Sequence, residues 1–386
     1  MSQTLLRPDT PALRTTEGYA ASPGRAPGER SERPRRAAWA AIVTVASIVA
    51  LGGTALARLD DGVAPAAPLP EELPLGSMYH VADQVGARQL WADGITGAGV
   101  NVAVIDTGVA PVPGLDAAGK VVAVADLSAE RFDDEARFVD GHGHGTHLAG
   151  IIAGRSAGTN PAATDGFSGI APDAGIVSVK VAGRDGDVTP AAVVSGIDWV
   201  IEHAAELDIR VISLALDTGY AGPYGSDPLA AAVERAWEAG IVVVTAAGNE
   251  GAESGGLNLP ASDPHVIAVG GVRAIEGAFE VPDWASAGDG VRNPDLAAPG
   301  AHIQSLRVPG SDADLYHPEG HVENELLFKG SGSSQAAGVV AGGAALLLQA
   351  NPSLTPDQVK AALVESATPL TDAPAEQVGH GLVNLP

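Results

Sequence analysis

The chain contains no cysteine and few aromatic residues, and both shortages limit what it can be. Without cysteine, disulfide bonds and catalysis by a thiol are excluded. Aromatic residues make up 4% of the 386 residues, whereas hydrophobic residues reach 45%. The core must therefore consist mainly of Ala, Val, Ile and Leu, which is typical of a parallel sheet packed between helices. An α/β fold is the expected class.

Basic residues are scarce as well. Lys and Arg number 22 against 47 Asp and Glu, which gives a formal net charge of −25. Seven of the arginines lie within residues 1–36, so the rest of the chain is more acidic still. A surface of this sign repels nucleic acid, and we expect no nucleic-acid partner.

The N-terminal region is expected to hold a membrane segment. Residues 1–36 are rich in Pro and Arg and are expected to form a disordered cytoplasmic tail. Residues 37–57 are 21 residues without a charge, close to the roughly 20 that span a bilayer. Arginines precede this segment and acidic residues follow it, so the positive-inside rule places the later chain outside the cytoplasm. A single-pass anchor in the cell membrane is expected, and secretion after cleavage near Ala57 is the alternative.

A Pro-rich linker is expected over residues 58–84, followed by one folded domain over residues 85–386. Within this domain, continuous apolar runs alternate with helical patterns, which indicates a doubly wound, mostly parallel sheet flanked by helices. Strands are predicted at 102–105, 121–125, 176–181, 211–216, 241–246 and 266–269, and helices at 189–205, 228–239 and 356–365.

Asp106 directly follows the first of these predicted strands. Ligands of parallel sheets bind beyond the carboxyl ends of the strands, where such a carboxylate can orient an imidazole and stabilise its charged form. An Asx turn at the end of the strand is the alternative interpretation.

His144 lies in a glycine-rich segment, residues 141–147, that leads into a helix of small residues. This arrangement exposes an imidazole that can act as a general base. His142, His144 and His147, with Asp140 nearby, are also spaced suitably for zinc, and an idle loop histidine is a third interpretation.

Ser334 begins a second helix of small residues, where backbone N–H groups and the helix dipole can stabilise an oxyanion. A helix N-cap is the alternative, and Ser331 and Ser333 are equally good caps. Asn249 stands between glycines after an apolar strand and can donate to the same oxyanion. The order Asp, His, Ser with such an Asn is far more specific than any one segment, and it indicates a peptide-bond hydrolase.

Taken together, these segments resemble the subtilisin-like serine peptidases, the subtilases, over about residues 85–385. The resemblance implies a serine endopeptidase that acts on polypeptides, in which Asp106 orients His144, His144 is the base, Ser334 is the nucleophile and Asn249 is the oxyanion donor. The resemblance implies that the reaction requires no cofactor. It allows for structural calcium, but no residues are assigned as calcium ligands. It also implies a substrate-binding set, which consists of Ala215, Leu216, Asp217, Ala246, Ala247 and Gly248.

The chain departs from the family pattern at several positions. Ala215-Leu216-Asp217 stands where the family usually has Ser-Leu-Gly, so substrate preference is expected to differ. Gln335 replaces a methionine beside the nucleophile, which removes an oxidisable thioether. Glu250 near the pocket rim would favour basic side chains, and the acidic residues 133–135 offer calcium ligands or simply a solvated surface. A catalytically weak peptide-binding module on the same fold is the alternative function.

Overall fold

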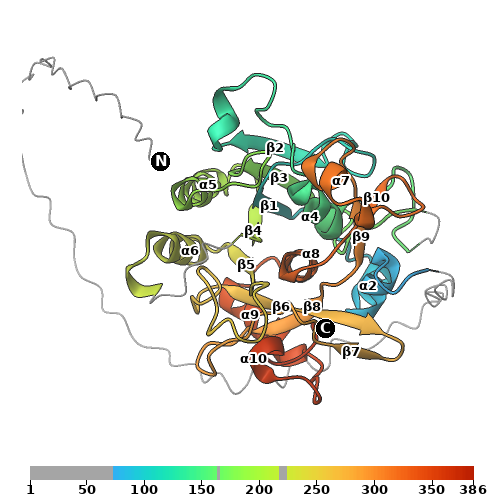
Figure 1. The fold of residues 1–386 in the computed structure, drawn as a ribbon, viewed down its shortest axis with the longest axis vertical. Helices are drawn as coiled ribbons and strands as arrows, with labels where there is room; N and C mark the ends of the chain where they lie inside the picture. The colour runs from blue at the N-terminus through green and yellow to red at the C-terminus, as the bar shows by residue number, and fades with distance from the viewer. Residues whose placement is uncertain (1–72, 163–165, 217–223) are drawn as a thin grey trace, which may run out of the picture. The chain divides into compact units, whose positions relative to one another are not determined.

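The computed structural model describes residues 73–162, 166–216 and 224–386 (Figure 1). The expected tail at residues 1–36 and the expected membrane segment at residues 37–57 lie outside these residues. Among the residues that are described, no helix is both long enough and apolar enough to cross a membrane.

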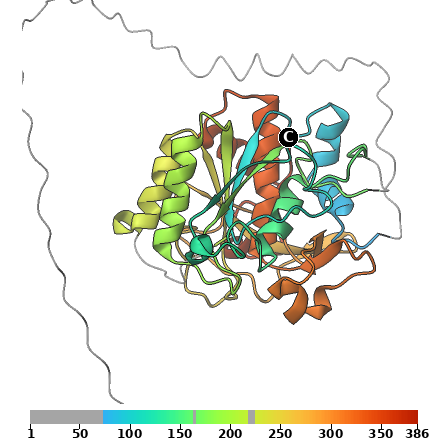
Figure 2. The ribbon, with the colours of Figure 1, turned by 90° about the horizontal axis from the view of Figure 1, so that it is seen from above.

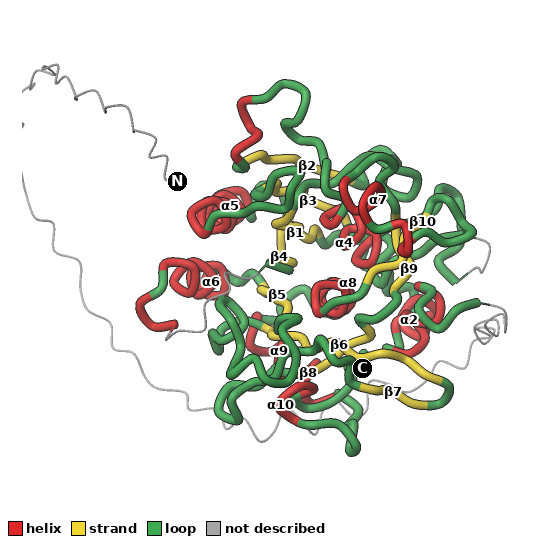
Figure 3. Tube along the Cα trace, viewed as in Figure 1, coloured by secondary structure: helices red, strands yellow, loops and turns green. Residues whose placement is uncertain are grey.

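A mostly parallel sheet of eight strands forms the centre of the domain (Figure 3). The strand order is β2-β3-β1-β4-β5-β6-β7, and β8 also pairs with β6. All neighbours pair in parallel except β6 and β7. The strands are β1 Asn101–Asp106, β2 Val121–Asp126, β3 Gly175–Lys180, β4 Ile209–Leu214, β5 Val242–Ala246, β6 Ile267–Ile275, β7 Ala278–Glu280 and β8 Leu296–Pro299.

Helices cover both faces of this sheet (Figure 2). The helices α5 and α6 pack against each other on one face, whereas α4 and α8 pack together on the other. The longer helices are α4 His144–Ala153, α5 Pro190–His203, α6 Pro228–Glu238, α8 Ser333–Ala350 and α9 Pro356–Ser366, and the shorter ones are α2 Met78–Gln84, α3 Ala87–Ala92, α7 Asp312–Tyr316 and α10 Ala375–Val378.

Small residues allow α8 to run through the interior of the domain. Nearly every residue of α8 is buried, and the helix contacts α4 and the strands β1, β4, β5, β6 and β8. A Cβ at Gly338 would lie 3.2 Å from the side chain of Ile151 on α4, so glycine lets the two helices approach closely. The parallel strands and the helices on both faces confirm the predicted doubly wound sheet, and its core consists mainly of aliphatic side chains.

Three strands differ from the prediction in their bounds or in their burial. The strand β4 ends at Leu214 rather than at residue 216, because the chain leaves the sheet at the site edge. The strand β6 extends to Ile275, where it forms a hairpin with β7. The edge strand β2 exposes Val122 and Val124, so its apolar run is covered on one face only.

The folded domain begins before residue 85, in part of the segment that was expected to be a linker. The helix α2 starts at Met78, and Ser77 caps its N-terminus by accepting a hydrogen bond from the backbone N–H of His80. Its apolar face is buried and contacts β9. This strand, Ile303–Leu306, pairs antiparallel with β10, Leu327–Gly330, in a small separate sheet.

Candidate active site

The proposed orienting carboxylate, Asp106, is the last residue of β1 and is completely buried. Its Oδ1 accepts hydrogen bonds from Nδ1 of His144 and from the backbone N–H of Thr107, both at 2.8 Å. Because two N–H donors meet one carboxylate oxygen, the carboxylate is held in one orientation. An Asx turn, the alternative interpretation of Asp106, therefore does not account for its hydrogen bond to the imidazole of His144.

His144 is the first residue of α4, and a quarter of its side chain is exposed. Burial lowers the pKa of the imidazole, but the charge and hydrogen bond of Asp106 outweigh this effect and raise the pKa above its ordinary value. For the carboxyl group of Asp106 the signs are reversed. Burial raises its pKa, but the charge and hydrogen bond of His144 outweigh burial, so the pKa is lowered below its ordinary value. The pair therefore favours an ionised carboxylate beside an imidazole that readily accepts a proton.

Two glycines allow His144 to reach Asp106. Gly143 has a φ of 98°, a left-handed conformation that starts the helix abruptly at His144. A Cβ at Gly145 would lie 2.2 Å from the backbone oxygen of Gly108, so only glycine permits this approach of α4 to the turn after β1.

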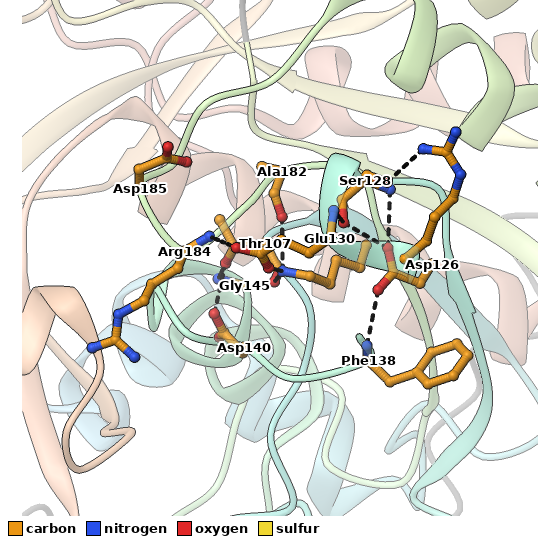
Figure 4. A network of polar contacts seen from close by, with 12 residues as sticks. Thr107, Asp126, Ser128, Glu130, Phe138, Asp140, Gly145, Ala182, Arg184 and Asp185 are labelled. Carbon is orange, nitrogen blue, oxygen red and sulfur yellow. Dashed lines mark hydrogen bonds and ion pairs between the residues drawn. The ribbon is translucent and has the colours of Figure 1, made fainter. Parts of the chain in front are cut away.

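A buried polar network supports the same turn (Figure 4). The hydroxyl of Thr107 donates to Oδ1 of Asp140 at 2.8 Å and accepts from the backbone N–H of Gly145 at 3.0 Å. Asp140 also accepts from the backbone N–H of Gly143 at 2.7 Å and from that of Thr146 at 2.9 Å. The loop after β1 and the first turn of α4 are thus tied together around one carboxylate.

Lys180, the last residue of β3, is fully buried beneath this turn. Its Nζ donates to the backbone oxygens of Thr107, at 3.0 Å, and Ala182, at 2.8 Å, and pairs with Glu130 at 3.0 Å. A buried ammonium needs such partners, since an unpaired charge in the interior is costly. No local motif indicates this role for Lys180, because Thr107 and Glu130 lie in distant segments of the chain.

Ser334 lies in the first turn of α8 and is 9% exposed. Its Oγ donates to the backbone oxygen of Ala215 at 3.3 Å. No hydrogen bond joins Ser334 to His144 among the described residues. Catalytic hydrogen bonds are often long or poorly aligned without substrate and tighten only when it binds.

The helix α8 has a glycine rather than a serine as its N-cap. Gly332 occupies the cap position without a side-chain bond. Ser331 instead accepts from the backbone N–H of His302 at 2.9 Å. The alternative in which Ser331 or Ser333 caps the helix does not apply, because both hydroxyls bond to other segments of the chain.

Ser333 orients Asn249, which follows β5 and is exposed. Oδ1 of Asn249 accepts from the backbone N–H of Ser333 at 2.8 Å and from its hydroxyl at 3.0 Å. The same hydroxyl accepts from the backbone N–H of Gly248 at 3.1 Å. Since the amide oxygen of Asn249 is occupied by two donors, the amide nitrogen is left to donate elsewhere.

The expected substrate-binding residues continue β4 and β5 beyond the sheet. Ala215 and Leu216 directly follow β4, and Ala247 and Gly248 directly follow β5, whose last residue is Ala246. The two strands are parallel neighbours, so both segments leave the same edge of the sheet next to Ser334. Asp217, the third residue of the departure from the family pattern, lies outside the described residues.

Gln335 is buried directly beside the nucleophile candidate. Its Oε1 has no hydrogen-bond partner among the described residues. A Cβ added to Gly330 would lie 2.7 Å from Nε2 of Gln335. A Cβ added to Gly332 would lie 3.0 Å from Oε1 of the same side chain. The side chain therefore fits tightly between these two glycines.

The three histidines proposed as zinc ligands have different surroundings. His142 lies edge-on to His144 with ring centroids 6.2 Å apart, and burial, followed by the charge of His144, lowers its pKa. His147 is buried, neither of its ring nitrogens has a hydrogen-bond partner in the described part of the chain, and burial lowers its pKa to about 3. Within the described residues these histidines do not gather into a metal-ligand group.

The acidic residues 133–135 do not converge either. Asp133 accepts from the backbone N–H of Glu135 at 2.9 Å, whereas Asp134 pairs with Arg137 at 3.0 Å. All three acidic side chains are exposed, and within the described residues they form no ligand group. These contacts fit a solvated turn better than a calcium site.

Comparisons with known proteins agree with this geometry. Residues 97–381 match the model of the Subtilase family, peptidase S8. Serine protease AprX of Bacillus subtilis (strain 168) is 37% identical over 302 residues, which cover 75% of this chain and 66% of AprX. Subtilisin DY of Bacillus licheniformis is 35% identical over 319 residues, which cover 82% of this chain and 98% of the relative.

A solved structure extends the similarity to three dimensions. Sphericase superposes with a TM-score of 0.58 at 27% sequence identity, over 70% of this chain and 84% of its own. The family match covers well over half of the chain, and it includes the carboxyl edges of β1, β4 and β5 and the N-termini of α4 and α8. The chain therefore belongs to the Subtilase family and is a subtilisin-like serine endopeptidase.

Proposed function

We propose that Ser334 is the nucleophile, His144 the general base and Asp106 the residue that orients the base. The observation that supports this most strongly is the 2.8 Å hydrogen bond between Nδ1 of His144 and the buried carboxylate of Asp106. This bond keeps the proton on Nδ1, so Nε2 retains a lone pair for the serine hydroxyl.

On substrate binding, the hydroxyl of Ser334 turns from the backbone oxygen of Ala215 towards Nε2 of His144. Oγ then attacks the scissile carbonyl carbon while its proton passes to Nε2. The resulting oxyanion accepts hydrogen bonds from Nδ2 of Asn249 and from the backbone N–H of Ser334. As the C–N bond breaks, His144 returns the proton to the leaving amine, and water then releases the acyl group by the same route.

The substrate main chain is proposed to lie between the segments that continue β4 and β5. Leu216 and Ala247 are at least partly buried at this edge, and Ser334 is next to it through its bond to Ala215. Two parallel strand ends of this kind leave unpaired backbone groups that an extended peptide can use.

Glu250 is the feature that supports a preference for basic side chains. Its Oε2 accepts from the hydroxyl of Ser286 at 2.6 Å, and this bond holds the exposed carboxylate next to Gly248. Cleavage of a peptide library by the wild type and by Glu250→Gln tests the preference. The variant is expected to lose several-fold in cleavage after Lys or Arg, while unchanged profiles would exclude the role of Glu250.

We also propose that the catalytic domain acts outside the cytoplasmic membrane, attached by residues 37–57 or secreted after cleavage near Ala57. This is supported by the uncharged stretch, the arginines before it, and Asp60 and Asp61 after it. N-terminal sequencing of fractionated protein distinguishes the two forms. An intact chain in the cytoplasmic fraction would contradict both.

Hydrolysis of a quenched fluorescent peptide tests the proposed reaction. Ser334→Ala should lower kcat by about 10⁶-fold, as removal of this nucleophile does in a subtilisin. Ser331→Ala, which alters a serine three positions earlier, serves as the control and should retain the wild-type rate. Peptide binding without turnover by the wild type would instead support the binding-module alternative.

A further inference from the structure

We propose that Glu234, Asp263 and His265 form a binding site for a divalent transition-metal ion of the Zn²⁺ class. Glu234 lies on α6, and the other two residues lie in the turn that leads into β6. One ligand atom from each residue lies within 4.8 Å of the others. Among the described residues this is the only group of its kind, and it is separate from the proposed triad.

The distances within the group fit ligands that share one ion. Nδ1 of His265 lies 3.3 Å from Oδ1 of Asp263 and 3.8 Å from Oε1 of Glu234. Two ligands of a tetrahedral ion with bonds near 2.0–2.1 Å are about 3.3–3.4 Å apart. A charge-assisted hydrogen bond would be shorter, about 2.7–2.9 Å. The 3.3 Å contact between the imidazole and Asp263 matches the separation of two ligands and is also a hydrogen bond, whereas the 3.8 Å contact with Glu234 is wider.

Asp263 supplies a second, independent observation. The residue is completely buried, yet its Oδ2 has no hydrogen-bond partner in the described part of the chain. A buried carboxylate oxygen without a partner is costly, and a metal ion is one way to compensate it. The bond from the backbone N–H of His265 to Oδ1, at 2.7 Å, leaves Oδ2 unsatisfied.

Two cations near the turn do not occupy the carboxylate. Arg292 donates to the backbone oxygen of Asp263 at 3.1 Å, and its guanidinium pairs with Asp295. Lys360 donates to the backbone oxygens of Pro264 and Val266 and also pairs with Asp295, at 2.9 Å. Both cations therefore hydrogen-bond to the backbone of the turn, and in the described part of the chain Oδ2 of Asp263 is left without a hydrogen-bond partner.

The ligand set also selects the class of ion. One neutral imidazole and two carboxylates balance the charge of a divalent ion, and the partly exposed Glu234 and His265 leave room for water as a fourth ligand. A nitrogen ligand and so few protein oxygens do not suit Ca²⁺, which prefers six to eight oxygen ligands. The ion would link α6 to the segment that connects β5 to β6. Asn249 lies near the start of this segment, and the proposed metal ligands Asp263 and His265 lie near its end.

Metal binding to the full-length chain carrying Ser334→Ala, in which autolysis is prevented, tests this proposal without reference to activity. Equilibrium dialysis against Zn²⁺ should give one ion per chain. At a hundredfold excess over Kd, Zn²⁺ should raise Tm by about 4 °C. Both effects should be lost in His265→Ala and Glu234→Gln, whereas Glu238→Gln, an exposed position on the same helix, should retain them.

Glu234 and His265 are partly exposed, so these variants are expected to fold, whereas a change at the buried Asp263 is avoided. Zinc that still binds with the same stoichiometry and Tm rise in His265→Ala would place the ion elsewhere, for example at His142, and would overturn the proposal. Stabilisation by Ca²⁺ but not by Zn²⁺ would overturn the class of ion. No Tm rise and no stoichiometric binding would overturn the site itself.

Discussion

The two halves of the proposed catalytic centre are organised differently. Asp106 and His144 are already joined by a 2.8 Å hydrogen bond, and the Thr107–Asp140 network and Lys180 support the turn that carries Asp106. Ser334, by contrast, donates to a backbone oxygen at 3.3 Å and has no bond to the imidazole. The acid–base half is thus assembled in advance, while the nucleophile half is positioned by backbone and needs the substrate to complete it.

Among changes that keep the nucleophile in place, the largest effect is expected from breaking the assembled half. Asp106→Asn should lower kcat by about 10⁴-fold, because the amide no longer fixes the tautomer or stabilises the imidazolium. Asp106 raises the pKa of His144, and the neutral base is the active form, so the variant should keep its residual activity to lower pH. The pH profile of kcat/KM measures both effects, and an unshifted acid limb would argue against the coupling.

A somewhat smaller loss is expected on the nucleophile side. Asn249→Ala should lower kcat by about 10²–10³-fold with little change in KM, which is the cost of removing a side-chain oxyanion donor in a subtilisin. Steady-state kinetics on one peptide substrate separate the two parameters. A change confined to KM would mean that Asn249 binds the ground state instead.

Lys180→Met tests whether the buried ion pair supports the acid–base half. Removal of one partner of a buried pair commonly costs about 3 kcal/mol of unfolding free energy, here because Glu130 and two backbone oxygens lose their donor. Urea denaturation of the Ser334→Ala background measures this loss. Lys120→Met, which changes a lysine that bonds only two backbone oxygens, is a matched comparison and should cost less.

The smallest effect should come from Ser333→Ala. The backbone N–H of this residue still bonds Oδ1 of Asn249, but the hydroxyl that donates to the same oxygen is lost. We expect a roughly tenfold fall in kcat, equivalent to about 1.4 kcal/mol, from one hydrogen bond. In the Asn249→Ala background the same change should have almost no effect, and full additivity would contradict a role through Asn249.

The sequence predicted what local motifs determine. Asp106 and His144 each stand at the junction of an apolar run and glycines, so their placement at the end of a strand and at the start of a helix followed from neighbouring residues. The order of the parallel strands was not predicted, but continuous apolar runs sufficed to indicate a sheet covered on both faces.

Contacts between distant segments were not predictable in the same way. The bond between Ser333 and Asn249 was not predictable, because the two residues are 84 positions apart in the chain. The contact between Lys180 and Thr107 was not predictable either, since Thr107 lies 73 positions earlier. The early start of the domain was missed because the prolines of the expected linker end at residue 74, and the helix that begins at Met78 is too short to show a clear period.

The most direct test of the central claim is the labelling of the purified chain by a fluorophosphonate, with the modified residue identified by mass spectrometry. The account predicts modification at Ser334 alone, with a labelling rate that falls by orders of magnitude in both Asp106→Asn and His144→Ala. Labelling at Ser331 or Ser333, or an equal rate in the His144→Ala variant, would contradict a serine activated by the assembled Asp–His pair.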